Sequence, residues 1–446
     1  MARRLTLLAA AFAFIHLGAG LRFSTVDTPD TPSYVDFART LGDQFTFANN
    51  AAVDLFRTPG YPVFIRTVWS VFGEGRTTVL AIQWLLLVGL ALTVAHFVNT
   101  RLLKSRNVTL YPAAVLLFLL DPLLTFGAYS LLSELLFACL IFAALFTCFD
   151  VAIQPVPRSA ALAGLWLGLA SVTRPVSVFL PVFLAPMLII MATPKRRAVQ
   201  VSLIFVGISC AVPLAWTARN MAVAGIPSVA TVGVFNLAHF RAAGVLAEAE
   251  GVSFAQADAE ISARTGRAIN TAAEYRQTSS VATEILSTHP LLAAKQVVKS
   301  SLFLLLDPGF IYIAQITGAS PRQSGVLAAF ATQGPAALLH YFETMAVVPS
   351  VLFVYCLLFT GFLYLTLLAG VWLAVSGSPA MASWIRIDNF RKWLILVALV
   401  SIYFIGIQAG PEAAGRFREA LLPLWHSVVL VTLSYLSNPR LRPSAD

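Results

Sequence analysis

The chain alternates long apolar segments with short polar loops. The apolar runs are continuous and show no period-two alternation, so they predict membrane-spanning helices and not barrel strands. A bilayer core about 30 Å thick requires roughly 20 apolar residues per helix. Ten segments approach this length, and we predict spans near residues 5–21, 78–98, 108–120, 131–149, 160–173, 175–192, 198–217, 347–373, 393–409 and 420–436.

One further region is ambiguous. Segments 300–316 and 326–340 are apolar enough either to cross twice or not to cross at all, because a single crossing would place the next basic loop on the wrong side. We therefore expect an all-α, polytopic transmembrane bundle of ten or twelve spans. We treat residues 1–446 as one integral membrane domain.

Composition supports this class and excludes others. With 58% hydrophobic residues, 11% charged residues and a mean hydropathy of +0.79, the chain is too apolar for a soluble globular protein. The net charge of +9 does not indicate nucleic-acid binding, because the basic residues gather in alternate loops. This pattern predicts a multi-pass membrane protein with both termini in the cytoplasm. The basic clusters are Arg3–Arg4, Arg101–Arg106, Lys195–Arg197, Arg386–Lys392 and Arg440–Arg442.

The cysteines give no sign of a metal or disulfide site. All four lie within apolar segments, and their spacing matches no metal-binding signature. Ligand spacing therefore implies no cofactor, and dependence on a divalent metal stays open. The four are Cys139, Cys148, Cys210 and Cys356.

Two external loops, 22–77 and 220–298, are long enough to fold. In the first, Thr31 is a candidate helix cap before Pro32, and the apolar period from Tyr61 to Phe72 predicts a second helix. That helix lies either in the membrane interface or against other parts of the protein. In the second loop, two capping boxes predict short helices, Ser253-x-x-Gln256 and Thr271-x-x-Glu274.

The candidate chemistry lies at the predicted outer face. The first loop carries three carboxylates, Asp27, Asp30 and Asp36, and the predicted topology brings Asp30 and Glu134 to the same side. A carboxylate can take a proton from an attacking hydroxyl. Arginines can hold a phosphate and stabilise the charge that develops on it as it leaves. The candidate phosphate ligands are Arg57, Arg174, Arg219, Arg416 and Arg418.

Each of these residues also has a structural interpretation. Asp30 lies between two prolines and can cap a turn, and Glu134 can pair with an arginine at the membrane surface. The arginines can act as interfacial anchors. His239, a candidate ligand to substrate, is a single loop histidine with no sequence partner.

The order of short motifs resembles the polytopic GT-C glycosyltransferases, and within them the bacterial protein mannosyltransferase and aminoarabinose transferase relatives. No single motif is specific, but their order and shared outer-face placement extend over most of the chain. They are Asp30-x-x-x-Tyr34, Arg57-Thr-Pro-Gly-Tyr-Pro, Ser133-Glu134, Thr173-Arg174-Pro175, Trp216-Thr-Ala-Arg219-Asn220, His289-Pro290 and Arg416-Phe-Arg418 with Pro423.

The resemblance implies a polyprenyl-phosphate sugar donor and inverting transfer, on the outer face of the plasma (inner) membrane, to a lipid, glycan or protein acceptor. By position, Asp30 matches the catalytic carboxylate of loop one and Glu134 a second acid, while Arg57 approaches the donor phosphate. We expect Tyr34, Asn220 and His239 to contact substrate. Many relatives carry adjacent acids in loop one, whereas here Thr31 follows Asp30, which weakens the case for a carboxylate-bound metal.

Two other classes remain open on the sequence. A transporter or flippase of lipid-linked or anionic solutes would also place arginines and carboxylates in a cavity. It should, however, show ionisable residues near the bilayer midplane on broken helices. A non-enzymatic scaffold would leave the external charges without a role.

Overall fold

The computed structural model describes residues 2–23, 27–44, 48–49, 52–316, 347–377, 379–412 and 414–437. In these residues the chain is an all-α, multi-pass membrane protein, with a single two-stranded ribbon, β1 (Ala48–Asn49) paired with β2 (Ala52–Val53). Seven helices are long and apolar enough to cross a bilayer, and the bent pair α5–α6 makes an eighth. The seven are α1 (Ala2–Phe23), α4 with η1 (Arg76–Leu102), α7 (Glu134–Ile153), α10 (Lys195–Ala224), α19 (Val347–Ser376), α21 (Ile387–Gln408) and η4 with α22 (Gly415–Leu436).

All ten predicted spans coincide with helices. Segments 160–173 and 175–192 correspond to shorter helices, α8 (Pro157–Thr173) and η2–α9 (Pro175–Ser177 and Leu180–Met191). Segment 300–316 divides between α15 (Pro290–Leu306) and α16 (Phe310–Ile316). Segment 326–340 lies outside the described residues, so the count of ten or twelve crossings stays a prediction.

The predicted span at 108–120 does not end in a simple turn. α5 (Leu110–Leu120) bends by 75° into α6 (Pro122–Tyr129). Asp121 lies at the break, and its carboxylate caps α6 by accepting hydrogen bonds from the backbone N–H groups of Leu123 and Leu124. The proline at the first position of α6 has no N–H to satisfy, which favours a helix start there.

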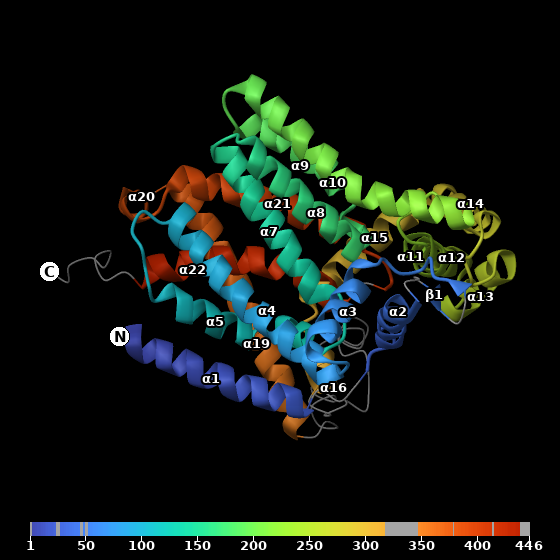
Figure 1. The fold of residues 1–446 in the computed structure, drawn as a ribbon, viewed down its shortest axis with the longest axis horizontal. Helices are drawn as coiled ribbons and strands as arrows, with labels where there is room; N and C mark the ends of the chain where they lie inside the picture. Colours follow the sequence, from blue (N-terminus) through green and yellow to red (C-terminus); the bar gives the residue numbers. More distant parts are fainter. Residues whose placement is uncertain are drawn as a thin grey trace.

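The helices of the two loops that were predicted to be external gather at one end of the molecule. Figure 1 shows α2, α3 and α11–α14 at this end, whereas α20 (Pro379–Trp384) lies at the opposite end. The first loop forms α2 (Thr31–Gln44) and α3 (Gly60–Phe72). The second forms α11 (Val232–Asn236), η3 (Leu237–Ala242), α12 (Ala243–Glu250), α13 (Phe254–Thr265) and α14 (Ala272–Thr288).

The second external loop has a small core of its own. Apolar side chains of η3, α12, α13 and α14 pack together, among them Ile261 and Val281. Both predicted capping boxes are confirmed, at Ser253 with Gln256 and at Thr271 with Glu274. Residues 232–288 therefore form a folded helical unit.

In the first loop, α3 packs on protein. Tyr61, Ile65 and Trp69 are buried, and the helix contacts α2, α4 and α8. Phe72, the last residue of the predicted apolar face, is 60% exposed. α2 begins at Thr31 itself, whose hydroxyl accepts a hydrogen bond from the Thr28 N–H group. Of the two interpretations of the apolar period, packing against neighbouring helices describes this structure.

Candidate active site

Five charged residues from distant parts of the sequence meet at the end of the bundle where α2 and α3 lie. Each lies at or beside the end of a helix: Asp30 before α2, Arg57 before α3, Glu134 at the start of α7, Arg174 after α8, and Arg416 in the 3-10 helix η4 (Gly415–Leu421). Residues at helix ends can project their side chains between elements without interrupting the helical hydrogen bonds.

Arg416 connects the two carboxylates. Its Nη2 lies 3.2 Å from Asp30 Oδ2, and its Nε lies 3.8 Å from Glu134 Oε1. Each carboxylate has a second arginine: Arg57 Nη2 is 2.6 Å from Asp30 Oδ1, and Arg174 Nη1 is 2.8 Å from Glu134 Oε1. The sequence-predicted residues Asp30, Glu134, Arg57, Arg174 and Arg416 therefore form one ionic cluster.

Local structure fixes the Arg57 side of the cluster. Asp54 Oδ1 accepts hydrogen bonds from the backbone N–H groups of Phe56 (2.5 Å) and Arg57 (3.1 Å), which closes a turn before α3. Burial raises the pKa of Asp54, although these two hydrogen bonds and the charge of Arg57 act in the opposite direction. The Arg57 guanidinium lies 5.0 Å from the centroid of the Tyr34 ring, so a cation–π contact adds to the ion pair.

The motif that follows Arg57 docks on the motif that contains Arg174. Thr58 Oγ1 donates to the carbonyl oxygen of Thr173 at 2.8 Å. Gly60 lies so close to Thr173 that a Cβ atom on it would stand 2.5 Å from Thr173 Oγ1. Two of the short motifs are thus in direct contact, and this contact sets the distance between Arg57 and Arg174.

Buried hydrogen bonds hold the segment that leads to Glu134. Gln83 Nε2 donates to the carbonyl oxygens of Gly127 (2.9 Å) and Ser130 (2.8 Å), and Tyr61 donates to Gln83 Oε1 at 2.5 Å. Ser133 directly precedes Glu134. Its hydroxyl lies 3.2 Å from the Tyr34 hydroxyl and accepts a hydrogen bond from Arg174 Nη1 at 3.4 Å.

The cluster has an excess of positive charge. Three guanidinium groups face two carboxylates, and the side chains of Arg57, Arg174 and Arg416 are only 16–22% exposed. Burial on its own raises the pKa of Asp30, but the charges of Arg57 and Arg416 outweigh it and hold that pKa below its usual value. Asp30 is therefore ionised at neutral pH.

Two buried polar atoms of the cluster have no hydrogen-bond partner among the described residues. They are Nε of Arg57 and Oε2 of Glu134. Buried polar groups are normally paired, so an unpaired donor and an unpaired acceptor in one site are suited to contacting a bound ligand. A half-buried site with surplus positive charge favours an anion such as a phosphate.

The remaining predicted residues have other contacts. Arg219 donates to the side chain of Asn220 and lies over the Trp216 ring. Asn220 donates to the carbonyl oxygens of Ser228 and Val229, which orders the start of the second loop.

Arg418 and His239 are both almost fully buried. Arg418 Nη1 donates to the carbonyl oxygens of Leu304 and Leu305. His239 Nδ1 is 2.8 Å from Asp258 Oδ1, within the helical unit of the second loop. The structure thus brings five of the predicted charged residues and Tyr34 together. Arg418 and His239 are instead bonded to other partners.

Some residues of the site were not predicted. Asp54 shapes the turn before Arg57 by accepting a hydrogen bond from the N–H group two residues later. An aspartate can form such a turn at many loop positions, so its presence in the sequence is a weak signal. Glu419 is fully buried, and neither of its carboxylate oxygens has a hydrogen-bond partner in the described part of the chain. The burial of Glu419 depends on the packing of η4 against α6 and α7, which no local pattern reveals.

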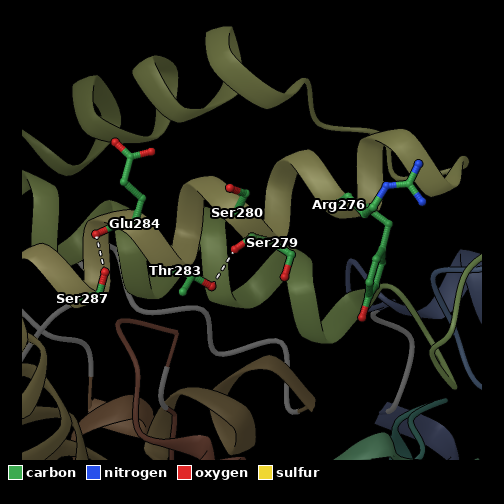
Figure 2. Close-up of a pocket in the computed structure, with 7 residues that line it drawn as sticks. Arg276, Ser279, Ser280, Thr283, Glu284 and Ser287 are labelled. Carbon is green, nitrogen blue, oxygen red and sulfur yellow. Dashed lines mark hydrogen bonds between the residues drawn. The ribbon is translucent and has the colours of Figure 1, made fainter.

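A groove of about 490 Å³ runs along α14, away from the cluster. It is lined by Tyr275, Arg276, Ser279, Ser280, Thr283, Glu284 and Ser287. Figure 2 shows that Thr283 and Ser287 bond to the backbone of their own helix. In the described ranges, no three histidine, cysteine, aspartate or glutamate side chains are grouped as metal ligands.

Comparison with known proteins gives a match in structure alone. No family profile and no curated protein sequence matches the chain. Among solved structures, it is similar to ArnT from Cupriavidus metallidurans in the apo state, with 14% identity over 95% of this chain and 77% of that chain, and a TM-score of 0.37. It is also similar to the same protein bound to undecaprenyl phosphate, with 16% identity over 97% and 78% of the two chains and a TM-score of 0.35. Because these scores are below 0.5, function is inferred below from the side chains of the site.

Proposed function

We propose that the protein is a membrane glycosyltransferase that moves a sugar from a polyprenyl-phosphate donor to an acceptor on the outer face of the membrane. The observation that carries this proposal is the position of Arg416 between Asp30 and Glu134, with Arg57 and Arg174 beside them. One site thereby combines a carboxylate base with several guanidinium groups for a phosphate.

In the proposed reaction, Asp30 removes the proton from an acceptor hydroxyl. The acceptor oxygen attacks the anomeric carbon of the sugar, and the bond from that carbon to the phosphate oxygen breaks with inversion. The electron pair of the broken bond leaves with the polyprenyl phosphate. Arg57, Arg174 and Arg416 stabilise the new charge, because bidentate guanidinium–phosphate contacts are strong where water is partly excluded. Glu134 keeps Arg174 and Arg416 in place.

The ion pairs of the free protein compete with the donor. Arg57 and Arg416 are bonded to Asp30 in the described structure, and they lower the pKa of that carboxylate after burial has raised it. When a phosphate takes over these guanidinium groups, the carboxylate loses part of its stabilisation and becomes a stronger base. Donor binding thus prepares Asp30 for proton removal.

We also infer the orientation of the chain. The basic clusters at 101–106, 195–197 and 386–392 favour the cytoplasm, which would leave α2, α3 and α11–α14 outside. The second external loop would then provide acceptor contacts through its exposed side chains, because His239 and Asn220 are buried and bonded within the protein. Lipid, glycan and protein acceptors are all compatible with this arrangement.

The test is a transfer assay with the purified full chain in detergent or nanodiscs. Labelled polyprenyl-phosphate sugars are supplied with candidate acceptors, and the release of polyprenyl phosphate is scored. We expect release by the wild-type protein and a rate about 10²- to 10⁴-fold lower for Asp30→Asn. Release that is equal in the two proteins would remove Asp30 as the base.

A transporter or flippase is the second candidate, and one observation favours it. The α5–α6 break places Asp121 inside the bundle, where its Oδ2 lies 3.1 Å from Nε2 of the fully buried His426. Broken helices with ionisable residues are typical of transporters. Proteoliposomes discriminate between the two functions, because a transporter moves a labelled lipid-linked sugar across the bilayer without cleaving it.

A further inference from the structure

The short helix η4, which carries Arg416, is attached to the end of α15. The attachment consists of hydrogen bonds on both sides of Arg416, one at Gly415 and the others at Arg418. These contacts join two segments that are more than a hundred residues apart in the sequence. None of the hydrogen bonds involves a side chain of the ionic cluster.

The first contact is made by Asp307. Its Oδ2 accepts from the Gly415 N–H group at 2.7 Å, and its Oδ1 accepts from the Gly309 N–H group at 2.9 Å. The fit at Gly415 is tight, because a Cβ atom there would stand 2.6 Å from Asp307 Oδ2. Asp307 therefore fixes the first residue of η4, directly before Arg416.

The second contact is made by Arg418. It is 2% exposed, and its Nη1 donates to the carbonyl oxygens of Leu304 (2.8 Å) and Leu305 (2.6 Å). These carbonyls belong to the last turn of α15, where helical carbonyls have no partner within the helix and a cation is favoured. The guanidinium group of Arg418 is thus committed to α15.

The geometry of η4 then sets the direction of Arg416. A 3-10 helix has three residues per turn, so residues two apart point to different sides. With Arg418 turned to α15, Arg416 is turned to Asp30 and Glu134. We propose that Asp307 and Arg418 are positioning residues that hold Arg416 between the two carboxylates. This inference rests on the proposed function only for its effect on transfer.

The activity test is a double-mutant cycle on the full chain. We expect Asp307→Ala to lower the transfer rate roughly 10- to 100-fold, since a displacement of about 1 Å can cost 10²-fold. In an Arg416→Ala background, the same change should lower the rate by no more than about twofold, because coupled residues are not additive. Gly415→Ala, which pushes η4 away from Asp307, should behave like Asp307→Ala. The proposal would be overturned if Asp307→Ala lowered the rate by the same factor in the wild-type and Arg416→Ala backgrounds. A rate of Asp307→Ala within twofold of wild type would overturn it as well.

A second measurement does not depend on catalysis. Infrared titration of ¹³C-aspartate-labelled protein, with the Asp30 band assigned by Asp30→Asn, follows the charge that Arg416 places beside Asp30. The midpoint of the Asp30 protonation curve should rise in Arg416→Ala, because the positive charge beside Asp30 is removed. It should also rise in Asp307→Ala, Gly415→Ala and Arg418→Lys, because Arg416 is then displaced from Asp30. If the midpoint moves only in Arg416→Ala, the positioning role is wrong even if the protein proves to be a transferase. If it moves in all four and the wild-type protein transfers no sugar, only the proposed function fails.

Matched controls separate positioning from general destabilisation. Glu274 also accepts backbone N–H groups, those of Asn270 and Thr271, and the Nε of Arg386 also donates to a carbonyl oxygen, that of Leu103. Glu274→Ala and Arg386→Ala should leave the Asp30 midpoint unchanged. If Asp307→Ala does not fold, Asp307→Asn and Gly415→Ala carry the same comparison.

Discussion

The guanidinium group of Arg416 donates to the carboxylate of Asp30 across 386 residues of sequence. This single contact joins the first external loop to the last helical segment, and Glu134 lies 3.8 Å from the same arginine. The surplus positive charge of the cluster makes the contact exchangeable, because an incoming phosphate offers the arginines a stronger partner than a carboxylate with two competing cations.

The first prediction concerns the base. Asp30→Asn keeps the size of the side chain and an oxygen that can accept from Arg57, but it removes the ability to take a proton. We expect transfer to fall by about 10²- to 10⁴-fold, the usual contribution of a general base. Thermal unfolding should change little, because Asp30 is 27% exposed and partly exposed ion pairs contribute little to stability.

The second prediction concerns the phosphate. Arg416→Ala should weaken binding of undecaprenyl phosphate at least tenfold, because it removes a charge-assisted contact worth about 1.5–3 kcal/mol. The control is Arg196→Ala, since Arg196 is exposed in the first turn of α10. Binding is measured by microscale thermophoresis in detergent, and equal effects of the two variants would contradict the role of Arg416.

The third prediction concerns pH. Burial raises the pKa of Asp30 and the adjacent arginines lower it further than burial raises it, so the net pKa is depressed. The carboxylate therefore stays ionised, and the acid limb of kcat/KM should lie below the pKa of an unperturbed aspartate, which is about 3.9. Arg57→Gln should move this limb to higher pH. A limb that stays in place would mean that another group controls it.

The same shift has a consequence for stability. A depressed carboxylate pKa stabilises the folded state at pH values above the unfolded pKa, and this contribution is lost as pH falls through the folded pKa. The wild type should therefore be slightly more stable than Asp30→Asn at pH 7, and this small difference should shrink when both proteins are unfolded at about pH 3.

Much of the fold is readable from the sequence, because all ten predicted spans coincide with helices of the described residues and both capping boxes formed. The meeting of Asp30, Glu134 and Arg416 was predicted from topology and motif order alone. What the sequence did not reveal depends on long-range packing. Arg418 has the same local appearance as Arg416, and only the position of α15 shows that its guanidinium is bonded to backbone carbonyls. The break at Asp121 likewise begins a second buried helix, α6, which lies between two of the predicted spans and was not predicted.

The fourth prediction tests the turn that presents Arg57. Asp54→Ala removes the acceptor for two backbone N–H groups and should cost about 1 kcal/mol of stability. It should also lower transfer several-fold, because the Arg57 backbone is no longer fixed. Asp54→Asn retains the acceptor oxygen and should behave nearly as wild type in both assays. Equal losses in the two variants would show that the charge of Asp54 matters and not its hydrogen bonds.

The fifth prediction tests the contact between the Arg57 and Arg174 motifs. In Gly60→Ala, the new Cβ would meet Thr173 Oγ1 at 2.5 Å and Thr173 Cα at 2.8 Å. Since the second atom is backbone, the strain cannot be relieved by a side-chain rotation, and overpacking of this kind typically costs 1–3 kcal/mol. We expect a lower melting temperature and reduced transfer, because α3 and Arg57 must move away from Arg174. The matched control is Gly89→Ala in α4, where no atom lies within 4 Å and the helix should gain up to about 1 kcal/mol. If Gly60→Ala melts and transfers like Gly89→Ala, the two motifs do not depend on close contact.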